Sequence, residues 1–569
     1  MTDATALAEC AYWEWPTHIA WSTDDPAENM SAPLPSALQG LLEPGAYPHP
    51  VEAVELVTTH ISWVLLAGDY AYKLKRPVRY PFIDLTSLER RRFLCGEELR
   101  LNRRFAAELY IDVCNVVDRD GKARIEVSGS GSGAGSPPRE HAILDYAVRM
   151  RRFPRAEELD RLLDGRRIEP HELETFGHEL AQTHARLPAA PTTSPWGRPE
   201  EVRAQLRRNF LECAGAASVF GSSQDVLALR DLLEDRLAAA ASSLAARRKN
   251  GRIRECHGDL HSRNIVRARG RLVAFDCLEY EPALRWIDTA DEIAFLSSDL
   301  KARERPLHAH AFRGGYLFES GDYHACRLLG LYEAHRALVR AKIAALSAES
   351  HGEGGSRDAL RREHLRLVAV ASGALAPRAP RVLLMSGLSG SGKTWLARQL
   401  AARLGAVHLR SDVERKRRAG LRELAPSHSR LAADLYSAEA SAIVYDDLAR
   451  AADDVLSGGI SAIVDATFLE RAQRTRFAGV AAARGAPLHL ILCEAPESVL
   501  RARIAERSRE RRDSSEADLN VLAWQSGRAE PLTADEGMNV IRVSTVDTRA
   551  FDVALRGLGG VPPGQPDQP

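Results

Sequence analysis

The stretch GLSGSGKT, residues 387–394, narrows what this chain can fold into more than any other feature. It fits the spacing G-x-x-x-x-G-K-[ST], follows the apolar run RVLLMS and opens the helical stretch WLARQLAARLG. Glycines at these places let backbone N–H groups wrap an anion, and the helix start adds partial positive charge. The pattern predicts a strand–loop–helix unit that binds phosphate, whereas a Gly/Ser-rich turn without a ligand is the alternative interpretation.

Two side chains of this loop have expected roles. Lys393 would reach the β- and γ-phosphates of ATP, and the Thr394 hydroxyl would bind Mg²⁺. The residues expected to hold the nucleotide here are Gly387, Leu388, Ser389, Gly390, Ser391, Gly392, Lys393 and Thr394.

The region around the loop alternates between apolar and helical stretches. The short apolar runs are 381–386, 406–410, 460–465, 488–493 and 539–543. This alternation predicts an α/β unit with a parallel sheet. Asp465 ends one predicted strand, where it could hold Mg²⁺ or simply form a turn. Asp412 follows another strand and could orient or deprotonate an acceptor hydroxyl, or Ser411 or Asp412 could instead cap a helix.

Residues 381 to about 545 resemble small P-loop kinases of the adenylate-kinase, gluconate-kinase and polynucleotide-kinase type. GLSGSGKT, RSDVERK and IVDATF carry this resemblance. Such kinases close an arginine-bearing lid over the transferred phosphate, and RARIAERSRERR (501–512) is the candidate segment. Arg503 and Arg507 share one helix face at i, i+4 spacing and would stabilise the transferring phosphate. A solvated basic helix is the alternative.

A second motif, HGDLHSRN, begins at His257. His257, Asp259 and Asn264 fit the spacing H-x-D-x-x-x-x-N of kinase catalytic loops. Asp259 would accept the proton of a substrate hydroxyl, and Asn264 would bind Mg²⁺. A polar turn ahead of an ordinary hairpin is the competing interpretation.

The stretch after this motif predicts a β-hairpin that turns near Gly270. Asn264 lies six residues before Gly270, and Asp276 lies six after it. Equal arms of an antiparallel hairpin bring its open ends together. We therefore expect Asn264 and Asp276 to be neighbours and to share a Mg²⁺ ion.

Lysine is rare in this chain, because only eight of the 77 basic residues are lysine. Lys73 lies on an apolar strand and would bind the α- and β-phosphates, held by Glu98 on the inward face of a helix predicted over 85–110. Lys75 shares the strand face of Lys73 and is the rival candidate. Thr86 and Glu89 are spaced like a capping box at the start of this helix.

The HGDLH…N…FD set, together with Lys73, looks like the aminoglycoside phosphotransferase-like family, which has a protein-kinase-like fold. The resemblance covers roughly residues 40–375 and is strongest over 257–296. It implies that His257 braces the loop, and it assigns no role to His261. No glycine-rich G-x-G-x-x-G loop precedes Lys73, and THISWV occupies its place.

The whole chain resembles bacterial fusions of these two kinase types. The expected fold is therefore an α+β protein-kinase-like N-terminal domain followed by an α/β parallel-sheet P-loop domain. The expected boundaries are an extension over 1–35, a kinase-like domain over 36–375, a linker over 376–380, a P-loop domain over 381–556 and a disordered tail over 557–569.

Composition excludes several function classes. The 77 basic and 77 acidic residues leave no net charge, which disfavours a chain that coats nucleic acid. None of the eight cysteines forms a C-x-x-C pair, and no apolar run approaches the ~20 residues of a membrane helix. The first residues lack the pattern of a signal peptide. We expect a reduced, cytoplasmic protein without a membrane partner.

These features favour an ATP- and Mg²⁺-dependent phosphotransferase with two nucleotide sites, which transfers phosphate to hydroxyl groups of small molecules. Two alternatives remain open. One domain could bind ATP only as a regulatory switch, which the missing glycine-rich loop suggests. The chain could instead phosphorylate nucleic-acid ends, which the resemblance to polynucleotide kinases suggests.

Overall fold

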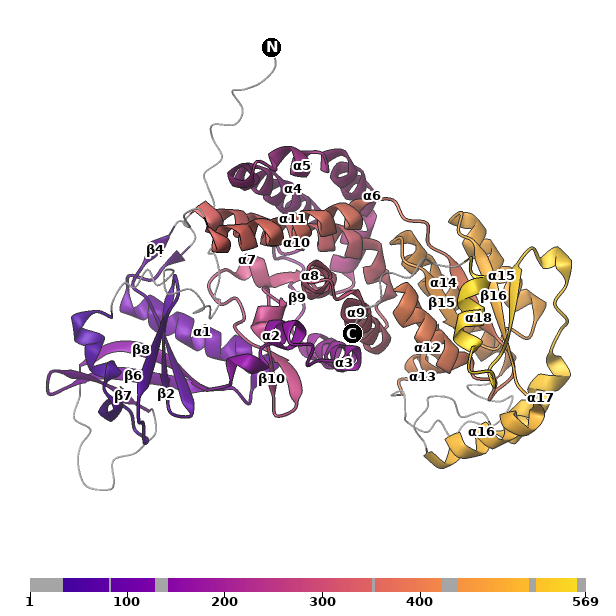
Figure 1. The fold of residues 1–569 in the computed structure, drawn as a ribbon, viewed down its shortest axis with the longest axis horizontal. Coiled ribbons are helices and arrows are strands. Elements are labelled where there is room, and N and C mark those ends of the chain that lie inside the picture. Colours follow the sequence, from indigo (N-terminus) through magenta and orange to yellow (C-terminus); the bar gives the residue numbers. More distant parts are fainter. Residues whose placement is uncertain are drawn as a thin grey trace, which may run out of the picture.

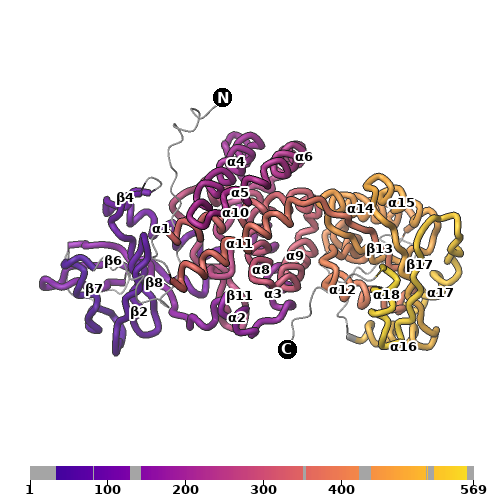
Figure 2. The backbone as a smooth tube through the Cα atoms, turned by 45° about the horizontal axis from the view of Figure 1, so that its top comes forward, coloured from indigo at the N-terminus to yellow at the C-terminus, as the bar shows by residue number. Residues whose placement is uncertain are grey.

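The computed structural model describes residues 34–80, 83–127, 142–349, 354–421, 437–510 and 518–559. The molecule is elongated (Figure 1). An N-terminal sheet forms one end, a group of helices forms the middle, and a second sheet with its own helices forms the other end. A view turned by 45° shows the same order of parts (Figure 2).

The N-terminal sheet has six antiparallel strands in the order β1-β2-β3-β8-β6-β7. Their bounds are β1 Val54–Thr58, β2 Ser62–Ala67, β3 Tyr70–Lys75, β6 Tyr110–Arg119, β7 Lys122–Glu126 and β8 Ile143–Arg151. A short pair, β4 (Arg79–Tyr80) and β5 (Ile83–Asp84), precedes helix α1 (Leu88–Ala106), which packs on β6 and β8. Tight turns at 68–69 and 120–121 join β2 to β3 and β6 to β7.

Helix α1 starts one residue later than the predicted capping box implies. Ser87 is the N-cap, and its hydroxyl accepts a hydrogen bond from the Arg90 N–H at 3.1 Å. Thr86 donates instead to Asp84 at 2.6 Å. The capping box of Thr86 and Glu89 is therefore wrong, because two hydroxyl residues stand side by side and sequence spacing alone could not decide between them.

The hairpin of β10 (Ile265–Ala268) and β11 (Arg271–Ala274) has a register one residue away from the expected one. Ala268 pairs with Arg271 around a two-residue turn, in which Arg269 and Gly270 both have positive φ. Such a turn matches the twist of the strands. Asn264 consequently lies opposite Phe275, with Asp276 one residue beyond the ladder.

Helices and one more strand pair form the middle of the molecule. Strands β9 (Ile253–Glu255) and β12 (Trp286–Asp288) pair antiparallel. The helices are α2 Leu159–Asp164, α3 Pro170–Arg186, α4 Pro199–Ala216, α5 Ser223–Leu227, α6 Arg230–Lys249, α7 Pro282–Arg285, α8 Thr289–Ala302, α9 Pro306–Ser320, α10 Cys326–Glu349 and α11 Gly355–Leu375. Helices α8 and α10 lie at the centre, since most of their residues are buried.

The C-terminal sheet has five parallel strands in the order β14-β15-β13-β16-β17. Their bounds are β13 Val382–Ser386, β14 Val407–Arg410, β15 Ala462–Asp465, β16 Leu488–Glu494 and β17 Asn539–Ser544. The helices are α12 Lys393–Leu404, α13 Ser411–Arg418, α14 Ala438–Ser457, α15 Arg471–Ala483, α16 Glu497–Glu510, α17 Leu519–Arg528 and α18 Ala550–Gly557. The predicted fold class is confirmed for both parts.

The helices of the middle region pack directly against the C-terminal sheet and its helices. One continuous group of buried apolar side chains runs from Leu159 in α2 to Leu490 in β16. Arg313 donates to the carbonyl of Gly405 at 2.6 Å, which crosses from α9 to the end of α12. Gly458 lies so close to the start of α10 that a Cβ atom there would stand 2.0 Å from the Cys326 carbonyl oxygen.

Some expectations fall on residues outside the described ranges. They include most of the extension over 1–35, most of the tail over 557–569, and the last two residues of the lid segment over 501–512. Among the described residues, no helix is long and apolar enough to cross a membrane. The seven cysteines in the described ranges are all buried and unpaired.

Candidate active sites

The stretch from His257 to Asn264 is held by buried acids of α8. Glu292 accepts hydrogen bonds from the backbone N–H groups of His257 and Gly258 at 2.7 and 3.0 Å. Asp299 accepts from the Ser262 N–H at 2.9 Å. His257 is fully buried, and its Nε2 lies 2.8 Å from the Phe275 carbonyl, so its placement is that of a brace. Burial lowers the pKa of His257 to about 4, which keeps the ring neutral.

Asp259 is partly exposed, because 30% of its side chain is accessible. Its Oδ2 accepts from Asn264 Nδ2 at 2.9 Å and lies 3.4 Å from His261 Nε2. Burial opposes the charge, but His261 and Arg340 hold the pKa of Asp259 well below its usual range. Asp259 is therefore ionised at neutral pH and has the exposure that a proton acceptor requires.

Asn264 and Asp276 each keep one oxygen available. Among the described residues, Asn264 Oδ1 and Asp276 Oδ2 are buried and have no hydrogen-bond partner. Buried oxygens without partners are rare unless a ligand or ion takes them. Asp276 has φ of +63°, and its backbone N–H donates to the Tyr110 hydroxyl at 3.0 Å. Two free oxygens of this kind fit the preference of Mg²⁺ for oxygen ligands.

The expected ion pair between Lys73 and Glu98 is present, with Nζ 2.8 Å from Oε1. Lys73 also lies 2.6 Å from Asp276 Oδ1, which ties the strand lysine to the candidate metal ligand. The rival Lys75 contacts Glu98 Oε2 at 2.5 Å and pairs with Glu279. All five side chains are buried. Both lysines thus belong to one cluster, and Lys73 is the one that contacts Asp276.

Three carboxylates face two ammonium groups in this cluster, so one negative charge lacks a partner. Burial raises the pKa of Asp276 to about 7, even though Lys73 acts in the opposite direction. Burial also disfavours ionised Glu98, but Lys73 and Lys75 together lower its pKa to about 2. A cation beside Asp276 would supply the missing positive charge.

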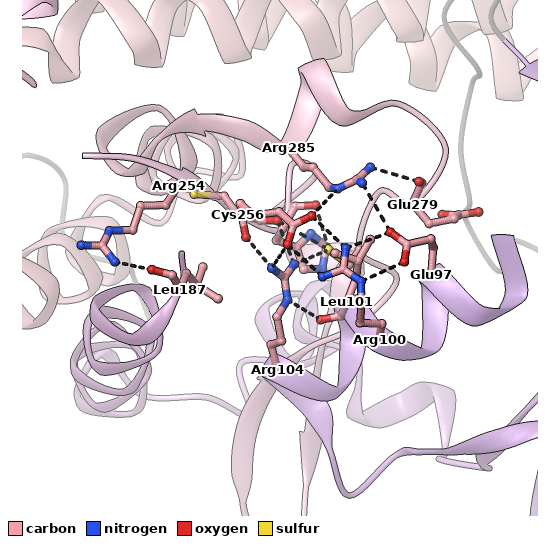
Figure 3. Close-up of polar contacts among 12 residues, drawn as sticks. Glu97, Arg100, Leu101, Arg104, Leu187, Arg254, Cys256, Glu279 and Arg285 are labelled. Atoms are coloured by element: carbon pink, nitrogen blue, oxygen red, sulfur yellow. Dashed lines mark hydrogen bonds and ion pairs between the residues drawn. The ribbon is translucent and has the colours of Figure 1, made fainter. Parts of the chain in front are cut away.

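A second polar network fixes α1, which carries Glu98, against the loop of residues 257–264 (Figure 3). Arg100 donates to both oxygens of Glu255 at 3.0 and 2.8 Å, and Arg104 donates to its Oε2 at 3.0 Å. Arg285, the last residue of α7, donates through its Nε to Glu255 Oε1 at 3.2 Å. Glu255 ends β9, two residues before His257, so this network sets the distance between α1 and the loop.

A pocket of about 650 Å³ is lined by strands β1, β2, β3 and β8 of the N-terminal sheet and by the segment 152–158. Val57, Ala71, Met150 and Phe153 contribute its apolar lining. Ala71 precedes Lys73 by two residues on β3 and therefore points to the same face. The pocket suits the flat base of a nucleotide whose phosphates extend toward Lys73.

The turn between β1 and β2 differs from a glycine-rich phosphate loop. It is short, since Thr58 pairs with Trp63. Arg76 donates to the carbonyls of Thr59 and His60 at 2.6 and 3.1 Å, which fixes the turn. Phosphates bound in this site would consequently depend on Lys73 and a metal ion rather than on backbone N–H groups of a glycine loop.

The P-loop lies between β13 and α12, as the sequence predicts. Gly387 has φ of +134°, and a Cβ atom there would stand 2.4 Å from the Cys493 carbonyl oxygen, so only glycine fits. Gly392 has φ of +85° at the N-cap of α12. Lys393 Nζ donates to the carbonyls of Gly387 and Leu388, each at 2.8 Å. The lysine thus crosses the mouth of its own loop.

Thr394 and Asp465 meet at the C-terminal edge of the sheet. The Thr394 hydroxyl donates to Asp465 Oδ2 at 2.7 Å. His408 Nε2 lies 3.2 Å from the same oxygen. Burial opposes the charge of Asp465, but its hydrogen bond to His408 and nearby cations lower its pKa to about 2. A hydroxyl beside an ionised carboxylate is the donor set expected for Mg²⁺ in such a loop.

A pocket of about 570 Å³ opens above the P-loop, and Asp412, Arg503 and Arg507 all line it. Asp412 is the second residue of α13, whose N-cap is Arg410 and has no side-chain cap bond. The helix-cap alternative for Ser411 and Asp412 is therefore wrong. Arg503 donates to the carbonyl of Gly390 at 3.2 Å and to that of Thr545 at 3.0 Å, so it also fixes the loop.

Sequence reasoning missed several residues that position the N-terminal site. Glu292, Asp299, Tyr110 and Glu279 hold the loop or the lysine cluster through long-range contacts. Only the acids of RWIDTADEIAFL carried a signal, because acidic side chains on a mostly apolar helix indicate buried partners. The sequence predicts no role for His261, but its Nε2 lies 3.4 Å from Asp259 Oδ2.

Two family models match separate parts of the chain. Residues 98–329 match the phosphotransferase enzyme family. Residues 382–532 match the AAA domain family. The chain thus joins a part similar to the phosphotransferase enzyme family to a part that contains a P-loop. Both resemblances predicted from the sequence are confirmed, and the kinase-type matches support ATP-dependent phosphoryl transfer.

Similar proteins cover either most of the chain or one of its parts. An uncharacterised protein of Mycobacterium tuberculosis (strain ATCC 25618 / H37Rv) is 28% identical over 487 residues, which cover 84% of this chain and 93% of that protein. The structure of a sugar kinase from Janibacter sp. HTCC2649 is 21% identical, with a TM-score of 0.26, over 32% of this chain and 96% of the other. An amicoumacin kinase is 13% identical, with a TM-score of 0.34, over 56% of this chain and 88% of the other.

Proposed function

We propose that the chain is a phosphotransferase with two ATP sites, each of which transfers the γ-phosphate to a hydroxyl group of a small molecule. The observation that carries this proposal is the duplication of parts. Each end of the molecule contains a lysine, a carboxylate and a further oxygen donor suited to Mg²⁺, and the two sets lie next to different sheets.

In the N-terminal site, the oxygen of the acceptor hydroxyl attacks the γ-phosphorus, and Asp259 takes the proton of that hydroxyl. The bond to the β–γ bridging oxygen breaks, and ADP leaves. Lys73 binds the phosphates, and Glu98 holds its ammonium group in place. Mg²⁺ held by Asn264 and Asp276 would neutralise charge on the phosphates.

In the C-terminal site, the P-loop backbone and Lys393 hold the phosphates. Thr394 and Asp465 would hold Mg²⁺, which neutralises charge there as well. Asp412 is placed in the same pocket to orient an acceptor hydroxyl or take its proton. Arg503 and Arg507 supply positive charge near the transferring phosphate.

The first test counts nucleotides bound by the full chain. Equilibrium dialysis with radiolabelled ATPγS and Mg²⁺ should give two nucleotides per wild-type chain. Lys73→Met and Lys393→Ala should each give one, and the double variant should give none. A wild-type stoichiometry of one would contradict the two-site proposal.

The second test follows transfer from γ-labelled ATP to a panel of small alcohols. Asp259→Asn should remove transfer to one group of acceptors, and Lys393→Ala should remove transfer to another. If two nucleotides bind but only one of these variants changes transfer, the silent site has a regulatory role instead.

A second candidate function applies to the P-loop site alone. Its pocket is lined by six arginines: Arg410, Arg415, Arg476, Arg503, Arg507 and Arg528. Arginine binds phosphate through paired hydrogen bonds, so an anionic acceptor such as a nucleic-acid end also suits this pocket. Incubation of the Asp259→Asn variant with 5′-hydroxyl oligonucleotides at low salt tests it. No labelled oligonucleotide product would eliminate this candidate.

A further inference from the structure

A cavity of about 330 Å³ lies in the helical middle of the molecule, and none of the expected site residues lines it. Three segments form its walls. They are the loop into α4 together with α4 itself, the segment 280–291, and the part of α10 around Tyr332 and His335. Its size is that of a small-molecule site.

The cavity abuts the catalytic loop. A Cβ atom on Gly258 would stand 2.9 Å from the carbonyl oxygen of Leu284, a wall residue. Arg336 connects the two features, since it holds Asp291 of the wall at 2.7 Å and reaches the Gly258 carbonyl at 3.4 Å. A molecule in this cavity would therefore lie beside the loop that carries Asp259.

Several aromatic side chains line the walls. Trp196 and Trp286 are half-buried and come from different segments of the chain, and Tyr280 adds a third ring. Leu206 and Ile287 continue the apolar surface. Large apolar rings with partly exposed faces favour a ligand that is itself flat and apolar over much of its surface.

One buried amide gives the cavity a defined polarity. Asn209 is only 5% exposed, and its Nδ2 donates to His335 Nδ1 at 3.3 Å and to the His335 carbonyl at 3.2 Å. The Asn209 amide nitrogen therefore has its acceptors within the protein. Asn209 Oδ1 is buried and has no hydrogen-bond partner among the described residues. An acceptor left in this state calls for a donor on the ligand.

The charges of the walls are largely neutralised within the protein. Asp288 pairs with Arg247 at 2.6 Å, Asp291 pairs with Arg336, and Glu212 pairs with Lys342 at 2.7 Å. At the exposed edge, one acid and one base, Glu201 and Arg208, offset each other. The Glu281 carboxylate caps α7 by accepting from the Ala283 N–H at 3.0 Å. A ligand with several positive charges would find few unpaired carboxylates here.

We propose that this cavity binds the acceptor of the N-terminal site, and that this acceptor is a flat, uncharged ring compound. It would carry a donor group for Asn209 Oδ1 and, toward the catalytic loop, the hydroxyl that receives the phosphate. The proton of that hydroxyl passes to Asp259, its oxygen bonds to the γ-phosphorus, and ADP leaves. This inference rests on the proposed phosphotransferase function and adds the class of its substrate.

Binding and transfer are measured separately in the Lys393→Ala chain, so that the P-loop site does not contribute. The probes are adenosine, thymidine and 4-hydroxybenzyl alcohol as neutral ring alcohols, choline as a single cation and kanamycin as a polycation. Saturation-transfer NMR measures binding, and label from γ-labelled ATP measures transfer. At least one neutral ring alcohol should bind ten-fold or more tightly than choline and kanamycin.

Variants then place the bound probe in the cavity. Asn209→Leu should weaken binding at least ten-fold, because it removes the acceptor oxygen. Glu200→Gln, an exposed position on the same helix, serves as the matched control and should change nothing. Thermal melting checks that each variant is folded.

Each outcome separates the two claims. Asn209-dependent binding without transfer would leave the cavity assignment in place and contradict the phosphotransferase proposal. Transfer to choline or kanamycin in preference to the ring alcohols would support the function and overturn the ligand class. No binding by any ring alcohol, or binding that Asn209→Leu leaves unchanged, would overturn the inference.

Discussion

The two lysines that serve the proposed nucleotide sites lie in opposite surroundings. Lys73 is 1% exposed and lies against the carboxylates of Glu98 and Asp276. Lys393 is only partly buried and donates to two backbone carbonyls. Carboxylates hold one ammonium group as part of an ion cluster, while uncharged loop atoms hold the other.

The two proposed sites therefore hold their lysine ammonium groups in different ways before a phosphate binds. In the P-loop, backbone N–H groups and the start of α12 already favour an anion, so Lys393 needs only to turn from carbonyl oxygens to phosphate oxygens. In the N-terminal site, phosphate must compete with buried carboxylates for Lys73. A divalent cation on Asp276 shifts that competition, because it removes negative charge from the cluster.

The largest expected effect comes from removing one metal-binding carboxylate at a time. Asp276→Asn should lower transfer by the N-terminal site roughly 10²–10³-fold and leave the P-loop site unchanged, and Asp465→Asn should do the reverse. Transfer rates measured across Mg²⁺ concentrations check this. A loss at both sites from either variant would show that the sites share one metal requirement.

The two strand lysines can be separated next. Lys73→Met should lower kcat/KM of the N-terminal site about 100-fold, since the lysine beside Asp276 is lost. Lys75→Met should affect kcat/KM less, because Lys75 pairs with Glu98 and Glu279 only. Each change leaves a buried carboxylate without its partner and should cost about 3 kcal/mol of unfolding free energy in urea. Equal losses of kcat/KM would show that the lysines act as one unit.

A smaller effect is expected at the P-loop. Arg503→Gln removes a charged donor from the carbonyls of Gly390 and Thr545 and should raise the KM for ATP roughly ten-fold. Arg501→Gln on the same helix removes only an exposed pair with Glu497 and is the control. Equal KM values for the two variants would argue against a role for Arg503 in fixing the loop.

The subtlest difference is the protonation of the two metal-site carboxyls in the metal-free protein. With a pKa of about 7, Asp276 is protonated below pH 7 and ionised above it, whereas Asp465, with a pKa of about 2, stays ionised throughout. Infrared difference spectra between pH 6 and pH 8 should show absorption of protonated carboxyl groups that falls as the pH rises, with Glu158 and Glu292 contributing beside Asp276, because burial raises the pKa of each of them to about 7 as well. Asp276→Asn should reduce this absorption by one carboxyl component, and Asp465→Asn should leave it unchanged. An unchanged difference spectrum in Asp276→Asn would contradict the raised pKa of Asp276.

Local sequence signals predicted much of the fold. The P-loop and the parallel strands each depend on residues close together in the chain, so motif spacing and the alternation of apolar and helical stretches sufficed. The hairpin register after Asn264 failed by one residue because it depends on whether Arg269 joins Gly270 in the turn. A non-glycine residue with positive φ leaves little trace in a sequence.

The candidate sites were predictable only where a motif is compact. Lys73 and Glu98 followed from strand and helix periodicity, but Lys75 shares that periodicity and could not be separated from Lys73 by it. Glu292 and Asn209 lie on helices far from the motifs, and their roles arise from packing over long sequence distances. No local pattern in the sequence records such contacts, because their partners lie far apart along the chain.

The tight contact at Gly458 has a consequence for how this fusion can change over time. Because no side chain fits between Gly458 and the Cys326 carbonyl, each half presents a surface shaped to the other. Neither half could be exchanged for a homologous part without remodelling this contact, because a single methyl group at Gly458 would overlap the Cys326 carbonyl. The two parts are therefore expected to change together over evolution rather than as interchangeable modules.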